Sequence, residues 1–130
     1  MQGLNAMTIK ASCLGELRNT PWTQESVSRR TIKQEMRENL LRKLESRESV
    51  FQGIHGYEET VIPQIFNAIL ARQNFILLGL RGQAKSRILR SLIELLDAEI
   101  PVISGCEIND NPYRPICKHC REILRARGDE

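Results

Sequence analysis

The fold is decided by residues 74–86, which read Asn74-Phe75-Ile76-Leu77-Leu78-Gly79-Leu80-Arg81-Gly82-Gln83-Ala84-Lys85-Ser86. An apolar run comes first, a loop with two glycines follows, and Lys-Ser then opens the amphipathic stretch 87–96. A strand, a glycine loop, Lys-Ser and a helix, in that order, are typical of a P-loop that binds a nucleoside triphosphate. We therefore expect residues 79–86 to hold the phosphates of ATP.

Each part of this loop has an expected task. Main-chain N–H groups of the loop would turn toward the phosphates, and the start of the following helix would add partial positive charge. Lys85 would reach the β and γ oxygens, while the Ser86 hydroxyl would bind Mg²⁺. We expect Arg81 and Gln83 to act through main-chain N–H groups. The predicted nucleotide-binding residues of this region are Gly79, Leu80, Arg81, Gly82, Gln83, Ala84, Lys85, Ser86 and Arg87.

Ala84 departs from the pattern, which has glycine directly before the lysine. We expect alanine to be accommodated there if its φ angle is negative. The alternative is a glycine-containing turn that binds nothing.

Size and composition suit one modest domain or part of a larger one. The chain has 130 residues, of which 41% are hydrophobic and 27% charged. No apolar run approaches the roughly 18–20 residues that a membrane-spanning helix needs. The first residues lack a basic segment followed by an apolar one, so we expect no secretion signal and a cytoplasmic location.

Basic residues are concentrated at the beginning of the chain. Residues 1–50 contain nine Lys/Arg and six Asp/Glu, whereas residues 51–130 contain ten of each. Acids alternate with bases, as on a solvated helix face, so we do not expect nucleic-acid binding. A zinc-dependent module that binds nucleic acid or a protein through the basic segment stays open as an alternative.

The four cysteines predict free thiols or a metal site. Disulfides are not expected without a secretion signal. Cys117 and Cys120 form Cys-Lys-His-Cys, a spacing that can place two thiolates on one zinc ion. Cys106 or His119 could complete the site, as could a second pair beyond Glu130, and Cys13 stands alone.

Periodicity predicts helices and strands in alternation. We expect residues 1–27 to be irregular, with Trp22 anchoring them to the core. Helices are expected from Thr31 (with Gln34 in a capping box and a Glu38–Arg42 pair), from Thr60 to about 72, over 84–96 and near 118–127. Strands are expected over 74–78 and 99–104, parallel and joined by a right-handed crossover.

The predicted fold is an α/β, partial P-loop NTPase with a three-layer core. Its expected divisions are a helical N-terminal arm (1–50), an incomplete ATP-binding core (51–116) and a Cys-x-x-Cys segment with a charged tail (117–130).

The order of these segments over residues 51–120 resembles the ATPase subunit of magnesium chelatase, within the AAA+ superfamily. Ile54 and Gly56, followed by Tyr57, sit where that family has a short box contacting adenine. The run Arg90-Ser91-Leu92-Ile93-Glu94-Leu95-Leu96 is similar to the family's helix after the P-loop, and Asn109-Asp110-Asn111-Pro112 is similar to its N-D-x-P segment. The resemblance implies ATP and Mg²⁺ as cofactors and a homo-oligomeric ring that remodels a protein partner.

The chain departs from that family in what it lacks. No apolar run ending in Asp-Glu supplies a Walker B residue, and Glu107 and Asp110 do not stand in such a run. No sensor residue, arginine finger or helical lid is recognisable, so hydrolysis by this chain alone stays undecided. We therefore expect a fragment that binds ATP, with hydrolysis and partner remodelling only in the complete protein. A nucleotide-binding or zinc-dependent regulatory module without turnover is the alternative.

Overall fold

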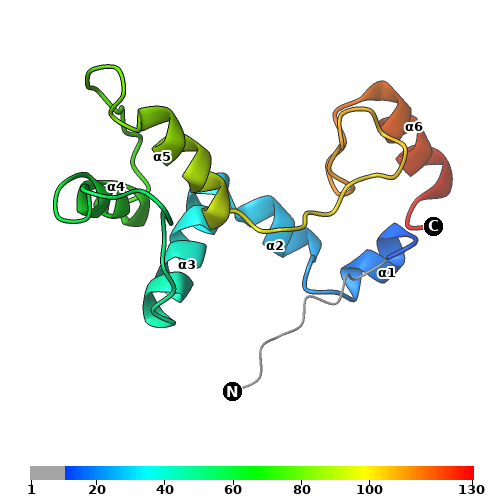
Figure 1. Ribbon diagram of the computed structural model, residues 1–130. Coiled ribbons are helices and arrows are strands. Elements are labelled where there is room, and N and C mark those ends of the chain that lie inside the picture. Colours follow the sequence, from blue (N-terminus) through cyan, green and yellow to red (C-terminus); the bar gives the residue numbers. More distant parts are fainter. Residues whose placement is uncertain (1–10) are drawn as a thin grey trace. The chain divides into compact units, whose positions relative to one another are not determined.

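A computed structural model describes residues 11–130 of the chain, and all regular structure in this range is helical (Figure 1). The α-helices and one 3₁₀-helix have these bounds: α1 Leu14–Arg18, α2 Gln24–Arg29, α3 Ile32–Glu45, α4 Val61–Leu70, α5 Lys85–Ser91, η1 Leu92–Leu95 and α6 Lys118–Arg127. They belong to two compact units. One consists of Arg30–Glu99, and the other combines residues 11–29 with Ile100–Glu130.

The unit Arg30–Glu99 contains the main hydrophobic core. Helix α3 packs against α4 and η1, and the 3₁₀-helix η1 continues α5. Phe51 and Phe66 stack in this core with their ring centroids 5.7 Å apart. The buried core residues are Leu40, Phe51, Ile54, Ile62, Ile65, Ile69, Ile88 and Leu95. The core therefore joins α3, the turn after it, α4, α5 and η1.

The beginning of α3 follows the prediction in part. The Thr31 side chain accepts a hydrogen bond from the Gln34 N–H at 3.3 Å, as an N-cap residue does. The Gln34 side chain donates to Glu38 at 2.7 Å, and Glu38 pairs with Arg30 at 2.7 Å. The predicted Glu38–Arg42 pair is wrong, because Glu38 faces Arg30 and Arg42 donates to Asn39 at 2.9 Å.

A polar network joins the end of η1 to α3. The Asp97 carboxylate pairs with Arg30, and the buried Asn39 amide donates to Asp97 at 2.9 Å and to the Leu95 carbonyl at 3.0 Å. The Asp97 N–H donates to Glu35 at 2.6 Å. Burial acts to raise the pKa of Asp97, but the hydrogen bonds from Arg30 and Asn39 outweigh it and hold this pKa below its usual value. The charged carboxylate therefore stabilises the fold.

Neither predicted strand is formed among the described residues. The segment 74–78 is extended, with Phe75 and Leu77 packed on the core while Ile76 and Leu78 are 82% and 88% exposed. This alternation is that of a strand with one covered face, but no neighbouring segment supplies ladder hydrogen bonds. The segment 99–104 also lacks a strand, and residues from 100 on belong to the other unit. The predicted three-layer α/β core is therefore not confirmed.

The second unit is held by contacts between segments distant in sequence. The Gly15 N–H donates to the Asp129 carbonyl at 2.8 Å, and Arg18 pairs with the Asp129 carboxylate at 3.1 Å. The Tyr113 hydroxyl donates to the Trp22 carbonyl at 2.6 Å. Helices α1 and α2 correct the expectation that this region is irregular, and residues 1–10 of it lie outside the described range. Helix α6 has the predicted bounds.

No helix in the described part of the chain is long and apolar enough to cross a membrane.

We predict that Asp97→Asn destabilises the unit Arg30–Glu99 by about 1–3 kcal/mol at pH 7, because Arg30 and Asn39 lose a charged acceptor in a half-buried site. A carboxylate with a lowered folded-state pKa contributes stability that is present above about pH 4 and is lost as pH falls through the folded pKa. Urea unfolding followed by circular dichroism should therefore show a large difference between the proteins at pH 7 and a small one near pH 3.

Glu48→Gln is the matched control for this measurement. Glu48 pairs with Lys43 at 3.3 Å, but its side chain is 57% exposed. The control should lose less than about 1 kcal/mol. Equal losses in both variants would contradict a special role for Asp97.

Candidate functional site

The loop between the extended segment and α5 is closed by Lys85. Its ammonium donates to the Gly79 carbonyl at 2.8 Å and to the Leu80 carbonyl. Lys85 is the first residue of α5, and its side chain is half-buried over the loop. The cation predicted to bind phosphate thus lies within the loop and is held there by neutral main-chain oxygens.

Gln83 has a side-chain role that the sequence did not indicate. Its Oε1 accepts a hydrogen bond from the Leu80 N–H at 3.0 Å. A Cβ atom at Gly79 would lie 2.2 Å from that oxygen and 3.8 Å from the Lys85 Nζ, so the glycine makes room for both side chains. The Leu80 N–H and the Lys85 ammonium therefore each donate to oxygen atoms of the loop itself. A phosphate oxygen could replace the carboxamide oxygen on this N–H.

Ala84 does not meet the condition under which we expected alanine to be accommodated, a negative φ. Its φ is +56° and its ψ is +11°, in the left-handed region. Gly82 also has a positive φ, of +81°. A left-handed residue other than glycine costs roughly 1–2 kcal/mol. The turn into α5 therefore needs the conformation that glycine adopts freely, and alanine is strained there.

Two hydrophobic anchors hold the loop to the core. Ile88, in the first turns of α5, is 2% exposed, and Leu77 packs on the same core before the loop. Between them, Leu80 is 77% exposed, and Arg81 and Ser86 are exposed as well. The Ser86 hydroxyl, the predicted Mg²⁺ ligand, is thus accessible next to Lys85.

The structure brings Arg87 to the turn that carries Ile54 and Gly56. A Cβ atom at Gly53 would lie 2.8 Å from an Arg87 guanidinium nitrogen, so the guanidinium rests against the Gly53 main chain. Ile54 is 5% exposed and packs in the core. The Gly56 N–H donates to the Glu58 carboxylate at 2.7 Å. The turn that resembles an adenine box is therefore next to the helix that follows the loop, with the Ile54 side chain facing inward.

Cys117 and Cys120 lie in a cluster with Cys106 and Asp110. One potential ligand atom from each of the four residues lies within 4.8 Å of the others. The Cys106 and Cys117 sulfurs are 3.9 Å apart, and Cys117 accepts a hydrogen bond from the Cys120 N–H at 3.2 Å. All four cysteines are free thiols. Of the two partners considered from sequence, Cys106 joins the pair, while His119 is exposed and is not in the cluster.

Asp110 organises the loop around this cluster. Its Oδ2 accepts hydrogen bonds from the Ile116 and Cys117 N–H groups, both at 2.8 Å, and its Oδ1 accepts one from the Asn111 N–H at 3.0 Å. The Cys117 N–H, together with that of Ile116, lowers the pKa of this carboxyl and outweighs the opposite effect of burial. The buried carboxylate therefore holds residues 110–117 in a closed turn.

The thiols of the cluster differ in acidity. The Asp110 N–H lowers the pKa of Cys106, supported by the Ile108 N–H, although burial acts in the other direction. The hydrogen bond with Cys117 raises the pKa of Cys120 to about 12, and burial adds to this effect. The surroundings thus shift the pKa values of these two thiols in opposite directions.

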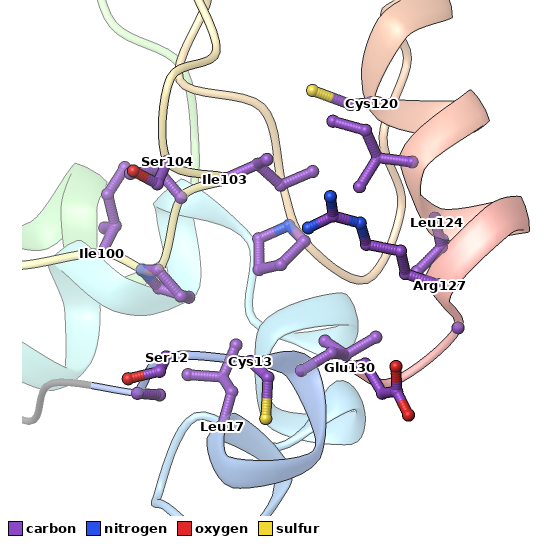
Figure 2. Close-up of a pocket in the computed structure, with 17 residues that line it drawn as sticks. Ser12, Cys13, Leu17, Ile100, Ile103, Ser104, Cys120, Leu124, Arg127 and Glu130 are labelled. Carbon is purple, nitrogen blue, oxygen red and sulfur yellow. The ribbon is translucent and has the colours of Figure 1, made fainter.

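A hollow of about 640 Å³ lies in the unit that contains this cluster (Figure 2). It is lined by residues of α1, α6 and the segment 100–104, and Arg127 extends its guanidinium into it. None of the lining residues belongs to the loop 79–86. Its lining is largely aliphatic and contains no arrangement that suggests a reaction.

Two known proteins are similar to this chain over part of its length. A "magnesium-chelatase subunit ChlI homolog" of Methanocaldococcus jannaschii is 37% identical over 80 residues, which are 61% of this chain and 21% of that protein. The "magnesium-chelatase subunit ChlI-2, chloroplastic" of Arabidopsis thaliana is 35% identical over 97 residues, which are 68% of this chain and 23% of that protein. The chain is similar to magnesium-chelatase ChlI subunits. It spans about a fifth of the length of these relatives. No family model matches it, and no solved structure matches it significantly.

The similarity agrees with the resemblance that the loop and its flanking segments indicated. Sequence reasoning missed two residues of the sites, Gln83 as a side-chain acceptor and Asp110 as a member of the cysteine cluster. Asp110 could have been suspected from its place four residues after Cys106, in a turn rich in Asn and Pro. Nothing in the sequence indicated which loop N–H the Gln83 side chain would meet.

We predict that Ala84→Gly stabilises the protein by about 1 kcal/mol, because glycine adopts the φ angle of +56° found here without a Cβ clash. Urea unfolding followed by circular dichroism measures the change.

Ala68→Gly in the interior of α4 is the matched control, with the same pair of residue types in a right-handed helix. It should destabilise by about 1 kcal/mol, the opposite sign. The same sign for both variants would show that the loop does not hold Ala84 in the left-handed region.

Proposed function

We propose that the loop 79–86 binds the triphosphate of ATP, as part of a magnesium chelatase-like AAA+ module. The observation that carries this proposal is the Lys85 ammonium, which is held in the loop by the Gly79 and Leu80 carbonyls next to the Leu80 N–H. Similarity to two magnesium-chelatase ChlI subunits supports it independently. A cytoplasmic location, where ATP is abundant, is part of the proposal.

Binding would exchange internal partners for phosphate oxygens. The Lys85 ammonium would leave neutral carbonyls for anionic oxygens, which form stronger, charge-assisted hydrogen bonds. The Leu80 N–H would exchange the Gln83 oxygen for a phosphate oxygen. Ser86, exposed beside Lys85, would hold the Mg²⁺ that accompanies the nucleotide. Arg87 and the turn with Ile54 and Gly56 would lie toward the nucleoside.

In the complete protein we propose that this module forms a homo-oligomeric ring and couples ATP hydrolysis to remodelling of a protein partner. Efficient phosphoryl transfer needs positioned charge beyond the loop, including an acidic residue that completes the Mg²⁺ site.

A module that binds nucleotide without turnover is the second candidate, and one feature of the sequence favours it. No apolar run ending in Asp-Glu supplies the acidic residue that would complete the Mg²⁺ site. A phosphate-release assay on the purified chain separates the candidates. Turnover lost in Lys85→Ala supports the hydrolysing module, while ATP binding without release of phosphate supports the second candidate.

We predict that Lys85→Ala weakens MgATP binding at least about tenfold, since a charge-assisted contact with phosphate contributes about 1.5–3 kcal/mol. Isothermal titration calorimetry of the purified chain measures the affinity.

Arg90→Ala is the control, because it removes one positive charge from the exposed last turn of the same helix. Its affinity should stay within about twofold, apart from a small long-range effect that salt screens. No binding by the wild-type chain, or equal losses in both variants, would refute the phosphate-binding role of Lys85.

A further inference from the structure

We infer that Cys106, Asp110, Cys117 and Cys120 form a mononuclear zinc site, with three thiolates and one carboxylate oxygen around the ion. This inference is independent of the nucleotide site, because its residues all belong to the unit of residues 11–29 and Ile100–Glu130.

The spacing of the ligand atoms fits one tetrahedral ion. Zinc–sulfur bonds of about 2.3 Å place two thiolates of a tetrahedron about 3.8 Å apart, and the Cys106 and Cys117 sulfurs are 3.9 Å apart. All four ligand atoms lie within 4.8 Å of one another. A disulfide would require about 2.05 Å between the sulfurs. An iron–sulfur cluster would separate the cysteines more widely, because several irons and sulfides lie between them.

A main-chain N–H group is directed at one of the sulfurs, as is common for thiolate ligands. The Cys120 N–H donates to the Cys117 sulfur at 3.2 Å. Such donors stabilise sulfur in its anionic, metal-binding form. They also offset the excess negative charge that three thiolates and a carboxylate would place around a divalent ion. The loop and the first turn of α6 therefore present the ligands in advance.

Asp110 keeps one acceptor position for the ion. A carboxylate has about four acceptor positions on its two oxygens, and the structure fills three with N–H groups of Asn111, Ile116 and Cys117. Two of these N–H groups share Oδ2, which leaves Oδ1 with a single one. The same hydrogen bonds fix the carboxylate beside the sulfurs, as supporting contacts do for metal-ligating carboxylates.

The unit needs a stabilising element that its core does not provide. Within the described residues of this unit, the buried hydrophobic side chains are those of Leu17 and Cys120. Small units rarely gain enough stability from so little burial, and natural ones add disulfides or a structural metal. Because the cysteines are free, disulfides do not stabilise this unit, and a structural metal is the remaining choice. An ion held by Cys106 and Asp110 on one side, and by Cys117 and Cys120 on the other, would tie the loop to α6.

Metal analysis of the protein purified from zinc-supplemented cells, without chelators, tests this directly. We expect one zinc ion per chain by inductively coupled plasma mass spectrometry. A strong chelator should lower the helix signal and change the fluorescence of Trp22, the single tryptophan, which lies in the same unit and accepts a hydrogen bond from Tyr113. Added zinc should restore both signals. A metal-free chain that binds neither Zn²⁺ nor Co²⁺ at micromolar concentration, or a chain that carries an iron–sulfur chromophore, would overturn the inference.

Variants of single residues identify the ligands. Cys106→Ser and Cys120→Ser should weaken Zn²⁺ binding, measured by competition with a chromophoric chelator, by more than about a hundredfold. Cys13→Ser is the matched control, because Cys13 is the fourth cysteine and lies outside the cluster. His119→Gln is the second control, because His119 stands between two ligands in sequence and is exposed. Both controls should bind zinc as the wild type does. Equal losses at Cys13 and Cys106 would overturn the site.

Cobalt substitution tests Asp110 without requiring that a variant fold as tightly as the wild type. Co²⁺ in the wild-type chain should give the intense visible bands of a tetrahedral ion and the ultraviolet bands of thiolate ligands. Asp110→Cys should retain the tetrahedral bands, shift them to longer wavelength and strengthen thiolate absorption by about a third, since four sulfurs replace three. Asp110→Ala should change the visible bands and retain the thiolate bands. Identical visible spectra in wild type, Asp110→Ala and Asp110→Cys would overturn the four-ligand assignment.

Discussion

Burial of one face of the segments on both sides of the loop is the constraint on which the proposed nucleotide site depends. Ile88 of α5 and Leu77 of the extended segment both pack on the core of the unit Arg30–Glu99. Because both ends of the loop are fixed in this way, its eight residues connect two anchored segments. The Lys85 side chain folds back over the loop and donates to the Gly79 carbonyl. The rest of the unit, including the Asp97 network, keeps α3 against η1 and thereby supports α5.

The loop combines this fixed framework with local strain. Ala84 is held at a positive φ that glycine would adopt without strain. The Lys85 ammonium donates to the Gly79 carbonyl and the Gln83 side chain accepts from the Leu80 N–H, so both side chains bond to the loop itself. Strained residues persist where the surrounding structure determines their conformation, and they cluster at binding sites. A triphosphate would meet N–H groups and an ammonium that are already close together, so little of its binding free energy would be spent on ordering the loop.

The local elements could be predicted from the sequence, and the pairings could not. Helix α6 has the predicted bounds because a Cys N-cap, basic residues in the last turn and Gly128 all act within a few residues. Thr31 begins α3 for the same kind of reason. The prediction of a strand over 74–78 was wrong, because a strand needs a neighbouring strand to pair with, and the hydrophobicity of one segment does not supply it. Arg30 was missed as the partner of Glu38, and Asp110 as a neighbour of three cysteines, because those contacts depend on how turns close.

Nuclear magnetic resonance of the ¹⁵N-labelled chain titrated with MgATP would show whether the loop 79–86 is a phosphate site. We expect the largest amide shifts at Leu80, Gly82, Lys85 and Ser86, with smaller ones at Gly53 beside Arg87. Mg²⁺ alone should leave these signals in place. Unchanged loop signals at millimolar MgATP, or shifts confined to residues 100–130, would contradict a phosphate site in this loop.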